Sequence, residues 1–223
     1  LLSPSDKIGS GDSRIVYDLL DSEASKIAFQ ELFSEVHWQR MYHAAGEVPR
    51  LVCCQGDIDD ADGSMPVYRH PSDQSLSLLH WSPVVSKIKE RAEERVGHKL
   101  NHALIQLYRS GQDHISEHSD KTLDVMPGSN IVNVSLGAQR TMRQQPIRRS
   151  NKNTTALALH NVSLCPTTAC SSWVWTRMDL GFMVSCQISA QLLSASLQSP
   201  LMATCASPSP SVILVHSSRP TRD

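Results

Sequence analysis

The segment HISEHSDKT, residues 114–122, contains residue types that bind metal ions. His118 and Asp120 are two positions apart, so on an extended strand both side chains point to the same side and can reach one ion. Two histidines and one carboxylate on one face of Fe(II) leave three coordination positions open, as in non-haem iron oxygenases. The H-x-D pair alone is a weak signal, because a two-residue match often arises by chance and a surface His–Asp hydrogen bond gives the same pattern.

Two short apolar runs flank this segment and predict the strands that hold it. ALIQLYRSG, residues 103–111, and SNIVNVSLG, residues 129–137, are rich in β-branched or other apolar side chains, and each run ends at a glycine. We therefore expect the candidate metal ligands to lie between two strands of a sheet.

An amphipathic helix is predicted near the start of the chain. Asp21 can cap a helix over residues 22–36, in which Ile27, Leu32 and Val36 fall near one face. Ala28 and Phe29 widen this apolar stripe. This face should pack against the rest of the domain.

A second helix is predicted over residues 82–100. Pro83 stands near its first turn, and Gly97 is placed to stop it. The stretch between the two helices, residues 56–75, is rich in Asp, Gly and Pro and predicts a loop with at most short strands.

The composition limits the architecture and the partners. With 223 residues, of which 40% are hydrophobic, the chain can bury one good core, so we expect one domain after a tail of residues 1–12. The formal net charge of -1 gives no global attraction to nucleic acid or to membranes. Neither a membrane span nor a signal peptide is recognisable, which favours an intracellular protein. The chain begins with Leu1 rather than methionine, so we expect its start to be incomplete.

The cysteines predict no metal or redox chemistry. There are six of them, including the adjacent pair Cys53 and Cys54, and none form a CxxC motif. This argues against a zinc ribbon or a redox dithiol, so reduced thiols are expected.

The motifs around the candidate ligands also form a known series. LNHALIQLYRSGQDHISEHSDKT, residues 100–122, is followed by GSNIVNVSLGAQRTM, residues 128–142, and preceded by VPRLVCCQGD, residues 48–57. The series resembles the AlkB family of Fe(II)- and 2-oxoglutarate-dependent dioxygenases, in the branch that repairs alkylated nucleobases. It covers roughly residues 13–145 and is specific because several linked motifs agree. The resemblance implies an α+β fold, namely a double-stranded β-helix (jelly roll) with N-terminal helices.

The resemblance also implies roles for individual residues. His118 and Asp120 would bind iron, and Tyr108 would contact 2-oxoglutarate. Gln106, a second co-substrate position, stands where the family commonly has asparagine. Thr122 stands where DNA-repair members often have an acidic residue near the target base.

The implied reaction is oxidative demethylation of alkylated bases in DNA, which serves DNA repair. 2-Oxoglutarate is converted to succinate and carbon dioxide, and the methyl group leaves as formaldehyde. The base must first leave the stack. The implied cofactors are Fe(II) and 2-oxoglutarate, and the implied partner is DNA with alkylated bases. We expect a monomer without membrane contact, in the nucleus or the cytoplasm.

The family also requires a second histidine and two arginines downstream, and the chain as it stands lacks its motifs for them. His160 and His216 do not lie in a segment resembling H-G-I-x-P-D-K-R. A second reading frame supplies these motifs when each residue's third codon base is joined to the next residue's first two bases. CPTTACSSWVWTRM, from Cys165 on, then reads PHNSLFVLGLDTN. Residues 182–190 read HGIMPDKR, and residues 205–217 read RISLTFR and, after one open position, IGTF.

We infer that the reading frame changes near residues 164–166. Each shifted codon has two bases fixed by the protein, so a family match at one position succeeds by chance about one time in five, and dozens of ordered matches are not luck. Residues 13–164 are then the N-terminal and central part of the dioxygenase domain, and residues 165–223 are its frame-shifted remainder. The missing histidine is encoded across Phe182 and Met183.

The missing arginines are encoded across Ser189/Ala190 or Cys205/Ala206, and across Ser211/Val212. The cysteines of the shifted part are then neither disulfide partners nor metal ligands, namely Cys165, Cys170, Cys186 and Cys205. We expect this part to lack the strands that close the second sheet of the jelly roll, and we expect no activity from the chain as it stands.

Other functions stay open. The chain could be a non-catalytic remnant that binds nucleic acid or nothing, or an AlkB-like oxygenase that acts on RNA or protein, which Thr122 keeps in view. A basic run without an acidic residue suits phosphate contacts, although a solvated strand edge gives the same pattern. Its members are Arg140, Arg143, Arg148, Arg149 and Lys152. The candidate nucleic-acid contacts are Arg140, Arg143 and Thr122.

Overall fold

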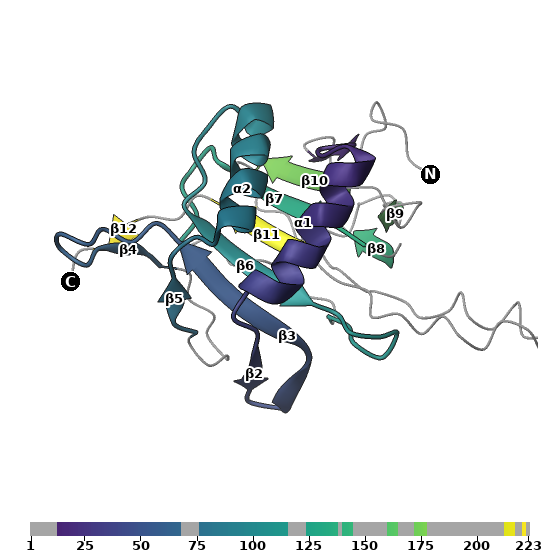
Figure 1. Cartoon of the computed structure of the whole chain (residues 1–223), viewed down its shortest axis with the longest axis horizontal. Helices are drawn as coiled ribbons and strands as arrows, with labels where there is room; N and C mark the ends of the chain where they lie inside the picture. The colour runs from purple at the N-terminus through teal and green to yellow at the C-terminus, as the bar shows by residue number, and fades with distance from the viewer. Residues whose placement is uncertain are drawn as a thin grey trace, which may run out of the picture.

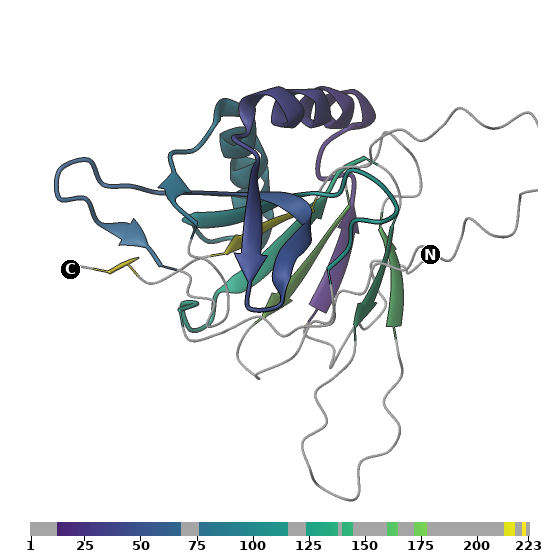
Figure 2. The same ribbon diagram turned by 90° about the horizontal axis from the view of Figure 1, so that it is seen from below.

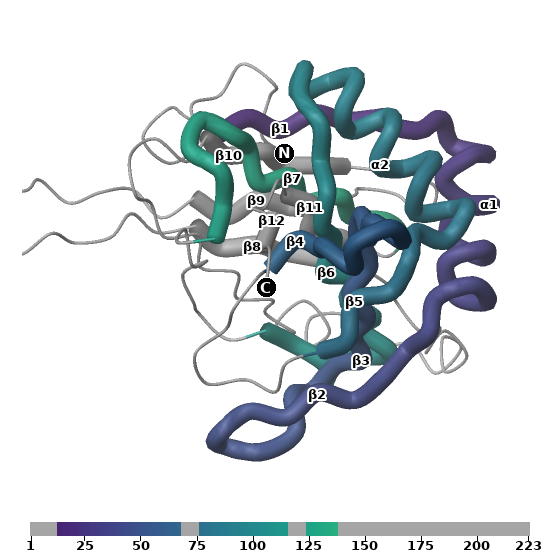
Figure 3. Tube along the Cα trace, turned by 90° about the vertical axis from the view of Figure 1, so that its left-hand side faces the viewer, coloured from purple at the N-terminus to yellow at the C-terminus, as the bar shows by residue number. Residues whose placement is uncertain are grey.

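Two helices lie on one face of an eight-stranded sheet in the computed structural model (Figures 1 and 3). The structure describes residues 13–67, 76–115 and 124–137 in full, and beyond them the backbone of the later strands. The elements described in full are β1 (Ser13–Tyr17), α1 (Ser22–Glu35), β2 (Gln39–His43), β3 (Gly46–Gly56), β4 (Met65–Pro66), β5 (Leu78–Leu79), α2 (Pro83–Val96), β6 (His102–Leu107) and β7 (Asn130–Ser135). The later strands are β8 (Arg140–Gln144), β9 (His160–Leu164), β10 (Ser172–Arg177), β11 (Val212–His216) and β12 (Pro220–Thr221).

The first helix, α1, forms where its capping signal predicts. The carboxylate of Asp21 accepts a hydrogen bond from the backbone N–H of Ala24 at 2.8 Å. Leu32 is buried as predicted, but the prediction for Ile27 is wrong, because this residue is 45% exposed. Ala28, which the predicted stripe also contained, is buried in the core between the helices and the sheet.

The second helix, α2, confirms both predicted end signals. Pro83 occupies its first turn, and Gly97 ends it with φ at +76° while its N–H donates to the carbonyl of Glu93. Its N-terminus is capped from α1, because Glu35 Oε2 accepts a hydrogen bond from the backbone N–H of Val84 at 3.1 Å. Within the described ranges, no helix is both long enough and apolar enough to cross a membrane.

The core lies between the helices and the sheet. Apolar side chains of both helices pack on inward-facing residues of β3, β6 and β7. The fully buried members include Leu32, Val85, Ile88, Ala92, Cys53, Ala103, Ile105, Val132 and Val134. Side chains alternate between the two faces of a strand, so the other positions of β6 and β7 face away from the helices.

The main sheet has the strand order β1-β10-β7-β11-β6-β3-β2, with β5 pairing to β3. The strands predicted on either side of the H-x-D segment are confirmed as β6 and β7. They are not direct neighbours, because β11 lies between them and is antiparallel to both.

The C-terminal part contributes β10 and β11 to the main sheet. β10 pairs with β1 and β7, and β11 pairs with β6 and β7. The physical reason is local: WVW in β10 and VILV in β11 are aromatic or β-branched runs with high strand propensity.

A second, smaller sheet consists of β8 and β9 (Figure 2). Residues 116–123 and 178–211, which would have to extend it, lie outside the described residues. The predicted loss of its closing strands therefore stays a prediction.

Candidate active site

Gln106 and Tyr108 lie together at the end of β6, on the face of the sheet away from the helices. Both are buried, with 4% and 1% of their surface exposed. The hydroxyl of Tyr108 donates to Gln106 Oε1 at 3.2 Å. The structure thus brings the two predicted co-substrate contacts into one hydrogen-bonded pair, while their role in binding stays a prediction.

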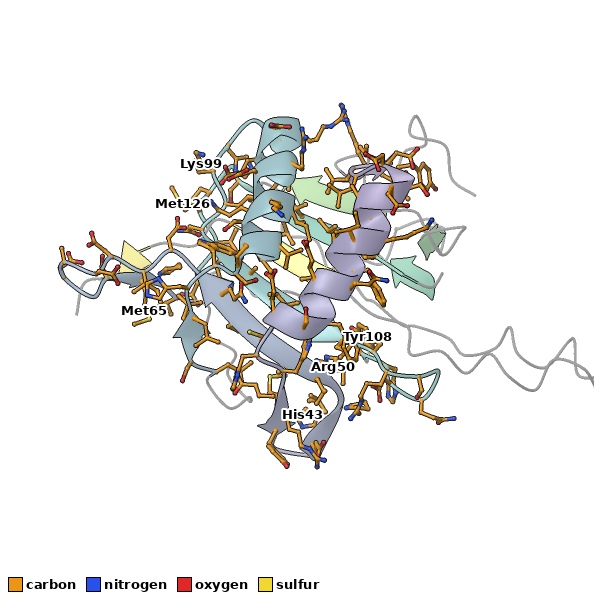
Figure 4. All side chains as sticks on the ribbon, in the orientation of Figure 1. His43, Arg50, Met65, Lys99, Tyr108 and Met126 are labelled. Atoms are coloured by element: carbon orange, nitrogen blue, oxygen red, sulfur yellow. The ribbon has the colours of Figure 1, made fainter. Side chains whose placement is uncertain are left out.

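Arg50 joins this pair from β3. Its Nε donates to Gln106 Oε1 at 2.6 Å, so this one oxygen accepts from both the guanidinium and the tyrosine. Only 8% of Arg50 is exposed. Register explains the meeting, because Leu51 pairs with Leu107 and the residues next to this pair are Arg50 and Tyr108 (Figure 4).

Sequence reasoning did not single out Arg50. A signal was present, since Arg50 lies two positions from Val48 and from Val52, which are both buried. A charged residue between two buried residues of the same strand face indicates a buried polar contact.

The turn after β6 leads the chain from Tyr108 towards the H-x-D segment. Asp113 closes this turn: its carboxylate accepts two hydrogen bonds from the guanidinium of Arg109, at 2.7 and 3.1 Å, and one from the Arg109 backbone N–H at 2.8 Å. His114 is then held by β3. Its N–H donates to the carbonyl of Pro49 at 3.1 Å, and its carbonyl accepts from Arg50 NH1 at 3.2 Å.

The predicted iron ligands, His118 and Asp120, lie outside the described residues, and so does Thr122. For Arg140 and Arg143 the structure gives the backbone position in β8 but not the side chains. In the described ranges no group of three His, Cys, Asp or Glu residues could hold a metal ion. The placement of iron therefore rests on the H-x-D segment, whose approach through His114 is well defined.

Further polar atoms lie on the same face as Gln106. Ser135 Oγ and Asn133 Oδ1, both on β7, are buried and form no hydrogen bond with the part of the chain that the structure describes. Val212 of β11 pairs with Gln106 on one side and with Ser135 on the other, which places these positions in one row.

Three titratable groups of β3 and β6 are uncharged near neutral pH, namely His102, Cys53 and Cys54. Burial lowers the pKa of His102 to about 4, because desolvation disfavours the imidazolium. Burial likewise raises the pKa of the thiols of Cys53 and Cys54, the latter to about 12. Both cysteines are free, as expected, and as protonated thiols they are poor nucleophiles and poor metal ligands.

Residues 12–172 match the family model of the 2OG-Fe(II) oxygenase superfamily. The chain belongs to this superfamily. The matched range contains Arg50, Gln106, Tyr108 and the whole H-x-D segment. The family uses Fe(II) and 2-oxoglutarate, so the two predicted cofactors are confirmed as those of this oxygenase family.

Similar proteins place the chain near the AlkB homologues, as its motifs predicted. The DNA oxidative demethylase ALKBH2 of Mus musculus is 33% identical over 126 residues, which cover 53% of this chain and 49% of that protein. The ALKBH2 protein of Homo sapiens is 34% identical over 126 residues, covering 53% and 45%. The alpha-ketoglutarate-dependent dioxygenase alkB homolog 3 of Homo sapiens is 28% identical over 138 residues, covering 59% and 46%. The chain spans about half the length of these curated relatives.

Proposed function

We propose that this oxygenase sequence encodes an oxidative demethylase of alkylated bases in DNA. The observation that carries the proposal is the buried Gln106–Tyr108 pair, which leads through the turn at Asp113 into an H-x-D segment. The names of the similar proteins supply the substrate class, because ALKBH2 is named a DNA oxidative demethylase.

The strand order supports the jelly roll as the finer description of the fold. A jelly roll places strands that are distant in sequence next to each other in two sheets. Here β11 stands between β6 and β7, and β10 stands beside β7, all antiparallel. β8 and β9 would begin the second sheet. We assign residues 13–164 to this domain and residues 165–223 to its frame-shifted remainder.

In this proposal each predicted residue has one task. His118 and Asp120 hold Fe(II), and Gln106 and Tyr108 face 2-oxoglutarate. When bound, the metal and the co-substrate supply the oxidation of an N-methyl group by dioxygen. Thr122 lies near the extruded base.

The phosphates of the DNA are bound by basic side chains that follow β7. Arg140 and Arg143 are three positions apart in β8. On an ideal extended strand, residues at an odd spacing belong to opposite faces. We therefore expect the two arginines to contribute unequally to DNA binding.

The register of β11 supports the change of reading frame. The codons of Ser211 and Val212 together encode arginine in the shifted frame, and Val212 pairs with Gln106. An arginine at this point would stand beside the co-substrate residues, where its planar fork can bind a carboxylate with two hydrogen bonds. The family match ends at residue 172, shortly after the inferred change near residues 164–166.

The deciding experiment compares the chain as it stands with a frame-corrected chain, in which one nucleotide is added or removed near codon 165. Formaldehyde or succinate release is measured on methylated DNA oligonucleotides with Fe(II) and 2-oxoglutarate. We expect no turnover from the former and turnover from the latter. Sequencing of the transcript across codons 155–190 checks the frame directly.

Matched variants of the corrected chain identify the iron site. His118→Ala and Asp120→Ala should each abolish Fe(II) binding and demethylation, whereas His80→Ala removes an exposed histidine and should leave both unchanged. Full turnover in either ligand variant would rule out the ligand assignment. Full activity of the uncorrected chain would overturn the proposed consequence of the frame change.

A second candidate function follows from the same missing residues. A chain with two iron ligands and no co-substrate arginine could act as a remnant that binds nucleic acid without turnover. A third is oxygenation of RNA or protein, which the threonine at position 122 keeps open. An inactive corrected chain on DNA, tested next on methylated RNA and on peptides, would favour these alternatives.

A further inference from the structure

We infer that Arg50 is a positioning residue that orients the amide of Gln106 and ties His114, at the start of the H-x-D segment, to the same side of the sheet. The inference rests on the proposed function for its catalytic meaning. Its structural content is a connection between two segments by one buried cation, since Arg50 of β3 donates both to Gln106 of β6 and to His114 in the turn after β6.

Arg50 sets the orientation of the Gln106 amide. A guanidinium carries only hydrogen-bond donors, so the amide must turn its oxygen towards Arg50. The 2.6 Å bond from Nε is charge-assisted, and the hydroxyl of Tyr108 occupies the second acceptor position of the same oxygen. Both acceptor positions of Oε1 are thereby used. The Nε2 group, with two N–H donors, is left to meet an acceptor such as a carboxylate.

Arg50 also holds the backbone just before the candidate iron ligands. Arg50 NH1 donates to the carbonyl of His114, four residues before His118, and the N–H of His114 donates to the carbonyl of Pro49. Two successive residues of β3 therefore hold both backbone polar groups of His114. The start of the H-x-D segment is fixed relative to Gln106 by one side chain.

The guanidinium of Arg50 is buried, because only 8% of the residue's surface is exposed. Water therefore cannot easily take over the hydrogen bonds that Arg50 makes. Loss of the fork should therefore release both Gln106 and His114 together. Residues that orient metal ligands typically change metal affinity or activity about 10- to 100-fold when mutated.

The first test uses the full chain as it stands and does not depend on activity. Amide hydrogen exchange is measured for the wild type, Arg50→Met and Arg50→Lys. Arg40→Met is the matched control, because Arg40 lies in the same hairpin with 64% of its side chain exposed and pairs with Glu47. We expect about 10-fold faster exchange at His114 in both Arg50 variants, unchanged protection in α1 and α2, and no effect of Arg40→Met.

Lysine keeps the charge of Arg50 but lacks the planar fork, so it should not restore the protection of His114. Wild-type exchange at His114 in Arg50→Met would overturn the inference. So would full protection in Arg50→Lys, which would assign the effect to charge alone. Equal loss of protection in both helices would assign Arg50 to general stability and would also overturn it.

The second test uses the frame-corrected chain and separates binding from chemistry. Arg50→Met should raise KM for 2-oxoglutarate about 10-fold with little change in kcat, because the amide that receives the co-substrate is no longer oriented. Placed in a Gln106→Leu background, the same substitution should add little. Independent effects of the two substitutions would contradict the connection through Gln106. If no variant turns over any substrate, the proposed function fails while the exchange experiment still decides the inference.

Discussion

Gln106 is held in place by hydrogen bonds from two side chains, and its proposed task is to face 2-oxoglutarate. Its carbonyl oxygen accepts from Arg50 and Tyr108, so the amide is anchored on the protein side. Asparagine, which the AlkB family commonly has here, is one methylene shorter.

His102 should make the stability of the folded chain depend on pH. Burial lowers its pKa to about 4, below the ordinary value of 6.5, so the unfolded chain binds a proton that the folded chain rejects. The contribution is fully present above pH 6.5 and is lost as the pH falls towards 4, by roughly 3 kcal/mol in total.

Chemical denaturation at several pH values between 7 and 4 measures this contribution. His102→Gln should flatten the pH dependence over this interval, whereas the exposed His80→Ala should not change it. The same slope in wild type and His102→Gln would show that other groups are responsible.

The two helices depend on each other through their ends. α2 has a serine at its N-cap, but Ser82 makes no side-chain cap bond, and Glu35 at the end of α1 accepts from Val84 instead. The orientation of α1 on the sheet thereby satisfies a backbone group of α2. Helix capping is in this case a tertiary contact.

Glu35→Ala should destabilise the chain by about 1 kcal/mol, because a helix N-terminus loses its cap. The midpoint of thermal unfolding should fall by about 2 to 4 °C for a chain of this size. Glu31→Ala is the matched control, since Glu31 lies on the same helix and only approaches Lys87 at 3.9 Å. An equal loss of stability in both variants would argue against the capping role.

Elements with local signals were predictable from the sequence, and contacts between distant segments were not. Asp21, Pro83 and Gly97 marked the ends of the helices because capping and backbone geometry are set within a few residues. β10 and β11 were missed because nothing near them reports their pairing with β7 and β6. Gln106 and Tyr108 were found through a motif. Arg50 was missed because its contacts require the register between β3 and β6.

The main sheet is built from both sides of the inferred change of frame. β10 and β11 come from the shifted part, yet they fill the positions between β1 and β6. This arrangement predicts that the chain as it stands folds further than its altered C-terminal sequence suggested.

Amide hydrogen exchange of β10 and β11 in the purified chain tests this expectation. Their amides should be protected to a degree similar to those of β6 and β7, because each backbone pairs on both sides. The two-residue strand β12 pairs only with β4 and serves as an internal reference of weak protection. Rapid exchange throughout β10 and β11 would contradict a continuous sheet.

The central place of β11 also governs the order of events during synthesis. β6 and β7 leave the ribosome long before residues 212–216 do. Until β11 has been made, β6 and β7 both lack the strand that lies between them in the folded sheet. The nascent chain must therefore wait with two open strand edges, which invite pairing with other chains. The closure spans about a hundred residues, a long loop that slows folding. A chain that ends before β11 would keep these strand edges exposed permanently. Chaperone binding to the nascent chain should therefore be strongest after β7 and before β11 has been made.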